Sequence, residues 1–158
     1  MAKTNEFEIY IEVSADNGAD NNALDLTDYV DIADNEALEI HDVDIVLDPD
    51  EAFPAVNSTC RFQLADSNIA TFVSHADRTS LYVARQSFVA TSFEMYHQES
   101  FSSLTPLIVS KTLFLRNVLE NGGAGGSLAF TLRLKGKIVK PTAKDYMALV
   151  LTQTGNVA

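Results

Sequence analysis

Hydrophobic and polar residues alternate one by one along much of this chain. In the segment 7–13, one face carries the apolar side chains Phe7, Ile9, Ile11 and Val13, and the other carries Glu8, Tyr10 and Glu12. A period of two is typical of a β-strand that buries one face and exposes the other. The same alternation recurs in STCRFQLAD (58–66) and in SLAFTLRLKGKIVK (127–140). The sequence therefore predicts half-buried strands at well-separated places along the chain.

Two further segments have less regular patterns. In ALEIHDVDIVLD (37–48), the apolar residues change phase at His41-Asp42. This predicts either one strand with a bulge or two short strands with a bend. In SFVATSFEMYHQ (87–98), Val89, Thr91, Phe93 and Met95 share one face of a single expected strand, and the opposite face is also partly apolar. We expect this strand to be covered on both sides.

A glycine-rich stretch, LENGGAGGSLAFT (119–131), separates the two longest strand candidates. It fits neither the G-x-G-x-x-G spacing of a dinucleotide site nor the G-x-x-x-x-G-K-S/T spacing of a P-loop. The segment after the glycines alternates like a strand, so we expect an antiparallel C-terminal hairpin over 106–140. Thr142 can cap a following helix, and Met147, Val150, Leu151 and Thr154 lie at helical spacing. A short C-terminal helix over 142–154 is therefore predicted.

These elements indicate a fold class. About seven or eight strands, joined by turns with almost no helix between them, do not suit a parallel sheet, which needs helical crossovers. The sequence predicts an all-β protein: an antiparallel β-sandwich, jelly-roll-like, with a short C-terminal helix. At 158 residues the chain is expected to form a single domain over 1–158.

The net charge of −11 is unevenly distributed. Residues 1–52 hold sixteen acidic side chains against Lys3, whereas residues 53–158 hold six acidic and ten basic ones. The acidic part is either a solubilising arm or a surface that meets the basic part of a neighbouring subunit. The candidate interface residues are Asp28, Asp31 and Asp34 on the acidic side, and Arg133, Lys135, Lys137 and Lys140 on the basic side.

Arg133, Lys135 and Lys137 alternate with apolar residues and should form a row on one strand face, and Lys140 and Lys144 extend it into a basic patch. This row is a solvated face, a contact with an acidic neighbour, or a contact with a polyanion such as a genome or with the anionic lipid of an internal membrane. The acidic total argues against sequence-specific nucleic-acid binding.

Residues that could carry chemistry are scattered. His41, His75 and His97 stand singly, without metal-binding spacing, and Ser74, His75 and Asp77 are too close in sequence to form a working triad. Cys60 alternates with apolar residues as a small buried side chain would. The N-terminal carboxylates leave opportunistic cation binding open. We expect no enzyme activity, no metal site and no cofactor.

The hairpin segment LFLRNVLENGGAGGSLAFTLRLKGKIVK, followed by TAKDYMALVL, resembles the single jelly-roll capsid proteins of tailless icosahedral viruses. The resemblance implies a sandwich that stands in a virion shell, as a homo-oligomer or beside other capsid proteins, often above an internal membrane. It carries over no functional residue, because shell proteins work through whole surfaces. At 158 residues the chain is small for this class, so major capsid, minor capsid, penton and decoration roles all stay open.

The leading hypothesis is thus a non-enzymatic structural protein of a virus capsid or virus-like shell, made in the host cytoplasm and located in the virion. The sequence shows no signal peptide and no transmembrane segment. The alternative is a carbohydrate- or ligand-binding module, lectin-like, an appendage or decoration protein that recognises its ligand with loop carboxylates and with aromatic residues such as Tyr29, Tyr82 and Tyr96. A small sandwich hydrolase would instead require His75 and His97 to line one cleft.

Overall fold

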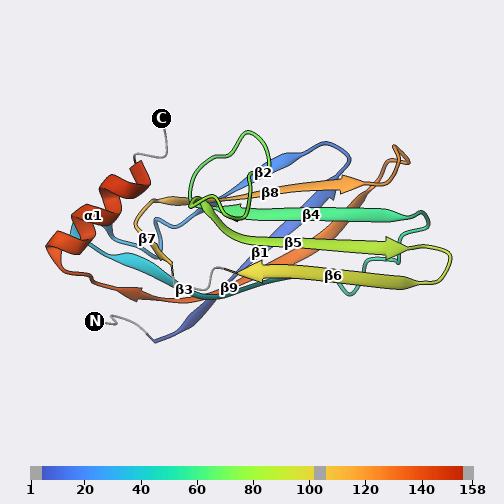
Figure 1. The fold of residues 1–158 in the computed structure, drawn as a ribbon. Coiled ribbons are helices and arrows are strands. Elements are labelled where there is room, and N and C mark those ends of the chain that lie inside the picture. The colour runs from blue at the N-terminus through green and yellow to red at the C-terminus, as the bar shows by residue number, and fades with distance from the viewer. Residues whose placement is uncertain (1–4, 102–105, 155–158) are drawn as a thin grey trace.

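Two antiparallel β-sheets face each other, and one short helix closes the C-terminal end (Figure 1). The computed structural model describes residues 5–101 and 106–154, without the side chains of residue 32 and residues 152–154. The four-stranded sheet has the order β1 (Phe7–Asp16), β9 (Ser127–Val139), β3 (Ala37–Leu47), β7 (Leu107–Ile108). The five-stranded sheet has the order β2 (Asp20–Asp25), β8 (Thr112–Glu120), β4 (Ser58–Ala65), β5 (Ser80–Val89), β6 (Glu94–Phe101). A 3-10 turn (Ile32–Asp34) and helix α1 (Ala143–Thr154) complete the described elements.

The strand pairs are nested. Strand β1 pairs with β9, β2 with β8, β3 with β7 and β4 with β5, each pair antiparallel. The pattern is that of one long hairpin whose two arms are wound together across both sheets, which is the jelly-roll arrangement. The predicted all-β, antiparallel, jelly-roll-like sandwich with a C-terminal helix is confirmed. The described residues form nine strands, more than the seven or eight predicted. The polar edge strand β2 and the two-residue strand β7 lack the alternation of apolar and polar residues that revealed the others.

The core lies between the two sheets and consists of the side chains that point inward, which are every second residue along most strands. Strand β9 alternates buried and half-buried residues over most of its length, as predicted. Phe62 of β4 meets Phe130 of β9 across the sandwich, with ring centroids 4.8 Å apart in an edge-on arrangement. Such an aromatic contact adds about 1 kcal/mol to the area that the rings bury.

The predicted single strand over 87–98 is wrong. The chain turns at 90–93 and returns as β6, so Phe88 lies opposite Met95 on the neighbouring strand. Phe93 has a φ of 54°, a left-handed conformation that interrupts the alternation. The side chain of Asn57 accepts a hydrogen bond from the Ala90 amide at 2.9 Å, which ties the turn to the loop before β4.

The glycine-rich stretch does reverse the chain, but the predicted antiparallel hairpin over 106–140 is wrong. Strand β8 lies in the five-stranded sheet and β9 in the four-stranded sheet, so the loop carries the chain from one sheet to the other. Four glycines of this loop, 122, 123, 125 and 126, have φ values from 68° to 83°. Glycine adopts this region without steric cost, so the loop needs glycine for its backbone conformation.

The bulge predicted near His41-Asp42 is present, as a register shift between Ile40 and Asp42 where β3 pairs with β9. Gly136 lies opposite Ile40, and a Cβ atom at this position would come within 2.5 Å of the Glu39 carbonyl oxygen. Glycine is therefore required where the bulge brings the two backbones together.

The predicted C-terminal helix is also confirmed. The Thr142 hydroxyl oxygen accepts a hydrogen bond from the Asp145 amide at 3.2 Å, which caps the first turn of α1. Tyr146 packs against Ala37, Val109 and Val139 at one end of the sandwich. Met147 and Leu151, by contrast, are 56% and 68% exposed. Helix α1 therefore covers one end of the core and presents two apolar side chains outward.

Candidate interaction surfaces

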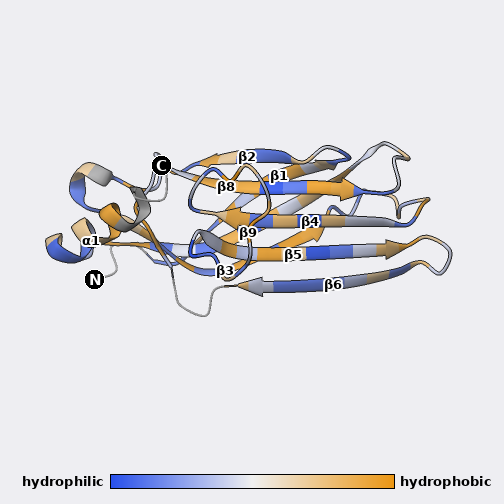
Figure 2. Ribbon diagram, turned by 45° about the horizontal axis from the view of Figure 1, so that its top comes forward, coloured by the Kyte–Doolittle hydropathy of each residue, from blue (hydrophilic) through white to orange (hydrophobic). Residues whose placement is uncertain are grey.

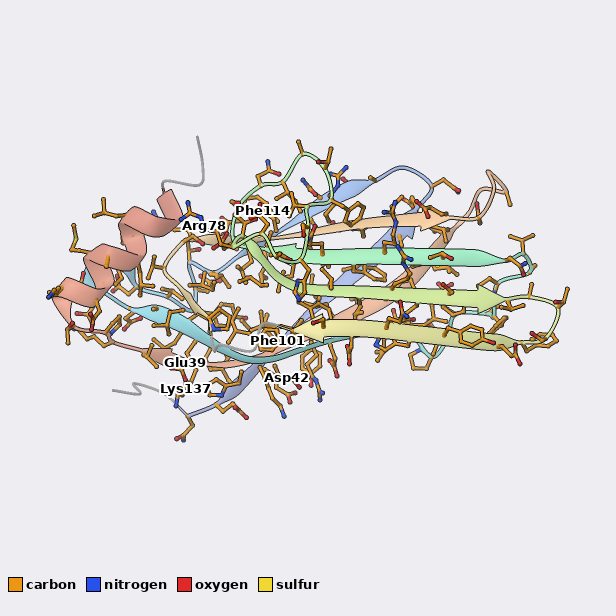
Figure 3. All side chains as sticks on the ribbon, in the orientation of Figure 1. Glu39, Asp42, Arg78, Phe101, Phe114 and Lys137 are labelled. Atoms are coloured by element: carbon orange, nitrogen blue, oxygen red, sulfur yellow. The ribbon has the colours of Figure 1, made fainter. Side chains whose placement is uncertain are left out.

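The predicted basic row lies on the outer face of the four-stranded sheet. Arg133, Lys135 and Lys137 alternate on β9 with the buried residues of the core, as the sequence pattern indicated. Because β9 runs between β1 and β3, outward-facing residues of both neighbours flank the row. Figure 3 shows Glu39 and Lys137 together on this side of the molecule.

Acidic side chains of the same chain neutralise this row. Arg133 binds both carboxylate oxygens of Asp44 on β3, with nitrogen-to-oxygen distances of 2.7 and 3.2 Å. The Lys135 ammonium lies 3.9 Å from Glu8 of β1, and Lys137 lies 3.5 Å from Glu39 of β3. The charges that are separated along the sequence are therefore interleaved in space. On this sheet, the separation of charge along the sequence is therefore not a separation of charge in space.

The remaining candidate interface residues lie near the helix end. The Lys140 ammonium forms an ion pair with Asp34 at 2.7 Å. Asp31 accepts a hydrogen bond from the Ala33 amide at 3.0 Å and so helps to shape the 3-10 turn. Asp28 is exposed and, within the described part of the chain, forms no ion pair with the basic row. As contacts to another subunit, these residues stay a prediction.

His41 lies at the bulge between two carboxylates, a site that the sequence did not reveal. Its Nδ1 is 2.6 Å from Glu6 and its Nε2 is 2.6 Å from Glu39. Hydrogen bonds to these two carboxylates raise the pKa of His41 above its ordinary value. The protonated ring donates to both oxygens and so joins the start of β1 to β3 over the intervening β9.

A groove crosses the outer face of the five-stranded sheet. One hollow of about 340 Å³ is lined by side chains of β4, β5, β6 and the loop 66–79, among them Arg61, Phe72, Arg85 and Gln98. A second hollow of about 310 Å³ shares Arg85 and Gln98 and extends to Tyr96. The groove thus has an arginine at its centre and an aromatic side chain towards each end.

The loop 66–79 forms one wall of this groove and is firmly attached to the sheet. The buried amide of Gln63 accepts a hydrogen bond from the Val73 amide at 2.9 Å and donates to the Val73 carbonyl at 3.0 Å. His75 links the loop to Ser80 and Ser100 at 3.0 and 3.1 Å. The Arg61 guanidinium lies 4.7 Å from the Phe72 ring centroid. These contacts hold the wall in place without a ligand.

The side chains considered for catalysis do not converge. His75 bonds to Ser80 and Ser100, whereas Asp77 accepts from the Thr79 amide at 2.9 Å. Ser100 lies on the outer face of β6, but His97 pairs with inward-facing Gln86, so the two histidines do not share a cleft. Burial raises the pKa of the Cys60 thiol to about 12, which suppresses the reactive thiolate.

Over 5–101 and 106–154, no three His, Cys, Asp or Glu side chains lie close enough to hold a metal ion. None of the helices in this part of the chain has the length and apolarity to cross a membrane.

Of the tyrosines considered for carbohydrate contact, Tyr82 is fully buried and donates to Glu99 at 2.6 Å. Tyr29 stacks on Phe7 at a centroid distance of 5.7 Å. Tyr96 is 58% exposed and lines the groove. Of the three tyrosines, Tyr96 lines the groove, whereas Tyr29 is 41% exposed elsewhere. The sequence did not reveal the arginines beside Tyr96, because their strands are distant in sequence.

One side of the sandwich is open. Residues 94–100 of β6 are exposed throughout, and Figure 2 shows this edge strand as mostly hydrophilic. Met95 lies opposite the buried Phe88 and so continues the core-facing side of the sheet, yet it is 50% exposed. Phe93, in the turn before it, is 77% exposed and contacts Phe53 at a centroid distance of 5.5 Å. Among the described residues, the inner face of β6 is therefore covered at Phe101, which packs against the core, and exposed from Glu94 to Glu99.

The opposite sheet is open on the same side. Strand β7 pairs with Leu38 and Glu39 alone, so the part of β3 beyond the bulge has β9 on one side and no described strand on the other. The Gln86 amide reaches across from β5 and donates to the Ile45 carbonyl at 3.0 Å. The Gln86 side chain thus satisfies one backbone carbonyl group on a strand edge that has no described neighbouring strand.

No protein-family model and no curated protein matches the chain. Among solved structures, a capsid chain of Desmodium yellow mottle tymovirus is similar to 90% of this chain and covers 94% of its own, with 8% sequence identity and a TM-score of 0.38. The resemblance to virus capsid proteins is confirmed as a weak similarity. The fold and its surfaces define an all-β, jelly-roll sandwich protein with one open side.

Proposed function

We propose that this protein is a non-enzymatic structural subunit that assembles with copies of itself, or with companion subunits, into a virus capsid or virus-like shell. The observation that carries the proposal is the exposure of the inner face of β6 from Glu94 to Glu99. On the neighbouring strand β5 this face of the sheet is buried in the core, whereas on β6 it faces solvent in the single chain. An assembled neighbour would cover it.

The physical argument starts from the apolar side chains at this open side. Burying a Phe or Met side chain fully is worth about 1.5–3 kcal/mol. Phe93 and Met95 are 77% and 50% exposed. A partner that covered both side chains would therefore gain several kcal/mol of binding free energy from their burial alone. His97 and Glu99, 3.2 Å apart, supply a polar pair beside them. An apolar centre with a polar rim is the usual composition of a subunit interface.

The backbone adds a second driving force. Unpaired strand edges are templates for pairing with another chain, and soluble monomers usually protect them. Here β6 forms the outer edge of one sheet, and β3 beyond the bulge is an edge of the other. The edges lie on the same side of the sandwich, so a single neighbour could contact both (Figure 1).

The test measures assembly and then removes the apolar contact. Multi-angle light scattering and negative-stain electron microscopy of the full chain should show defined oligomers or particles at high concentration. Phe93→Asn removes the ring and keeps a residue type that tolerates the left-handed conformation. Met95→Lys places a charge at the same interface.

Both variants should shift the protein towards monomer without lowering its melting temperature by more than a few degrees. The matched control is Tyr10→Ser, because Tyr10 is 62% exposed on the outer face of the other sheet. It should assemble like the wild type. A monomer at every concentration and ionic strength, or equal assembly of all three variants, would contradict the proposal.

A further inference from the structure

A second surface, separate from the open side, has the composition of a ligand site. We propose that the groove on the outer face of the five-stranded sheet binds an acidic saccharide, with Arg85 and Arg61 contacting a carboxylate or sulfate group on the sugar. This activity goes beyond assembly and rests on different residues.

The two arginines are placed as neighbours at an electrostatic cost. Arg61 of β4 and Arg85 of β5 are direct cross-strand partners, and like charges in this arrangement repel. Arg61 has a counter-ion, Glu120, at 2.5 Å. Arg85 is exposed and, among the residues that the structure describes, makes no ion pair. In a chain of net charge −11, the centre of this groove carries a cation that a ligand anion can pair with.

The groove is also organised in advance. Phe72 lies between two guanidinium groups, 4.7 Å from that of Arg61 and 5.4 Å from that of Arg116. Cation–π contacts of this kind restrict the long arginine side chains. Gln63 holds the adjacent Val73 through both backbone groups. Binding therefore requires little ordering of this wall and of Arg61, which favours affinity.

The other lining groups favour a sugar over a more highly charged ligand. Gln98, Ser87 and Ser100 offer neutral amide and hydroxyl groups, and Tyr96 offers an exposed aromatic ring. The carboxylate of Glu99 also lines the first hollow, but Glu99 belongs to the core-facing side of β6 and accepts a hydrogen bond from the Tyr82 hydroxyl. Ring faces and neutral hydrogen-bonding groups suit the hydroxyl-rich body of a saccharide. A nucleic acid would need several free cations to pair with successive phosphates. One unpaired arginine, with a second beside it, suits one oxyanion on an otherwise neutral ligand.

The size of the groove is consistent with this ligand. Its two hollows, about 340 and 310 Å³, are joined through Arg85 and Gln98. Ligand sites usually measure about 300–1,000 Å³. The joined hollows can therefore take more than one sugar ring, with the acidic group at the arginines.

The experiment is isothermal titration calorimetry or NMR titration of the full chain with three saccharides. Sialyllactose carries a carboxylate, sulfated lactose carries a sulfate, and lactose is the neutral reference. We expect sialyllactose or sulfated lactose to bind at least tenfold more tightly than lactose, and binding to weaken with added salt. The comparison of the two acidic probes shows whether carboxylate or sulfate is preferred.

Arg85→Gln should lower the affinity for the acidic probe at least tenfold, and Tyr96→Ala should lower it severalfold. The matched control Lys111→Gln removes an exposed cation outside the groove and should leave binding unchanged. Thermal melts verify that each variant is folded. Equal binding by Arg85→Gln and wild type, equal binding of lactose and the acidic probes, no binding of any probe, or tighter binding of an acidic peptide than of a saccharide would overturn the proposal.

Discussion

Asn117 gives the most quantitative test of the core. This residue of β8 is fully buried, and within the described ranges neither its side-chain oxygen nor its side-chain nitrogen has a hydrogen-bond partner. It lies on the same strand face as the buried Leu113 and Leu115 and opposite Phe62 of β4, so it faces the interior of the sandwich. Each unpaired buried polar group costs about 1–3 kcal/mol.

Asn117→Leu should therefore stabilise the protein. Removing two unpaired groups and adding apolar contact should raise the free energy of unfolding by about 2 kcal/mol or more. For a chain of this length, 2 kcal/mol corresponds to a rise in melting temperature of about 4–8 °C. Urea denaturation followed by circular dichroism measures the change, and the slope with denaturant should stay constant.

The matched variant Asn117→Asp tests whether the site is as buried as the structure shows. A carboxylate in this position has no cation partner, so the variant should unfold at a lower urea concentration at pH 8 than at pH 4. If Asn117→Leu were instead less stable than the wild type, the amide would be making hydrogen bonds that this account lacks, and the reasoning would be refuted.

Three other changes have defined outcomes. Gly136→Ala should lower the free energy of unfolding by about 2 kcal/mol or more, because the new methyl group would collide with the Glu39 carbonyl oxygen at the bulge; urea denaturation measures this, and a neutral result would contradict it. Burial raises the pKa of Asp66 to about 6, so its contribution to stability is fully present below about pH 4 and is lost as the pH rises through 6. Asp66→Asn should remove this pH dependence and stabilise the protein at pH 7 by on the order of 1 kcal/mol, a figure reduced for the partial exposure of the group, and an unchanged pH profile would refute the assignment. The pKa of His41 is raised and the pKa values of Glu6 and Glu39 are lowered, so the stabilisation from their pairing is fully present between about pH 4.5 and 6.5. His41→Gln should therefore lower the free energy of unfolding more at pH 6 than at pH 9. Equal losses at the two pH values would count against the pairing.

Local alternation predicted most of the sheet residues, because a buried face imposes its period on each strand separately. The same signal located the bulge at His41-Asp42, where the phase of the pattern changes. It did not show the turn at 90–93, because Phe93 is apolar and continues the pattern while its backbone leaves the strand. It also could not show which sheet a strand joins, so the glycine loop was interpreted as a hairpin tip instead of a connection between sheets.

The candidate surfaces were less predictable for a related reason. The basic row was placed correctly on the face of β9, but its neutralisation depends on Glu8 and Asp44, whose strands are far away in the sequence. Arg61 and Arg85 lie 24 positions apart and become direct neighbours only when β4 pairs with β5. A single sequence contains no signal for such pairing between distant segments. The groove therefore emerged from the fold alone.

The central claim is that another subunit covers the open side along β6. Amide hydrogen exchange over residues 94–101, measured on concentrated assembled protein and on dilute dissociated chain, tests it most directly. The account predicts that exchange in this segment slows by about tenfold or more on assembly, while exchange on the outer face of the four-stranded sheet changes little. Equal exchange in both samples, or the absence of any assembled form, would contradict the claim.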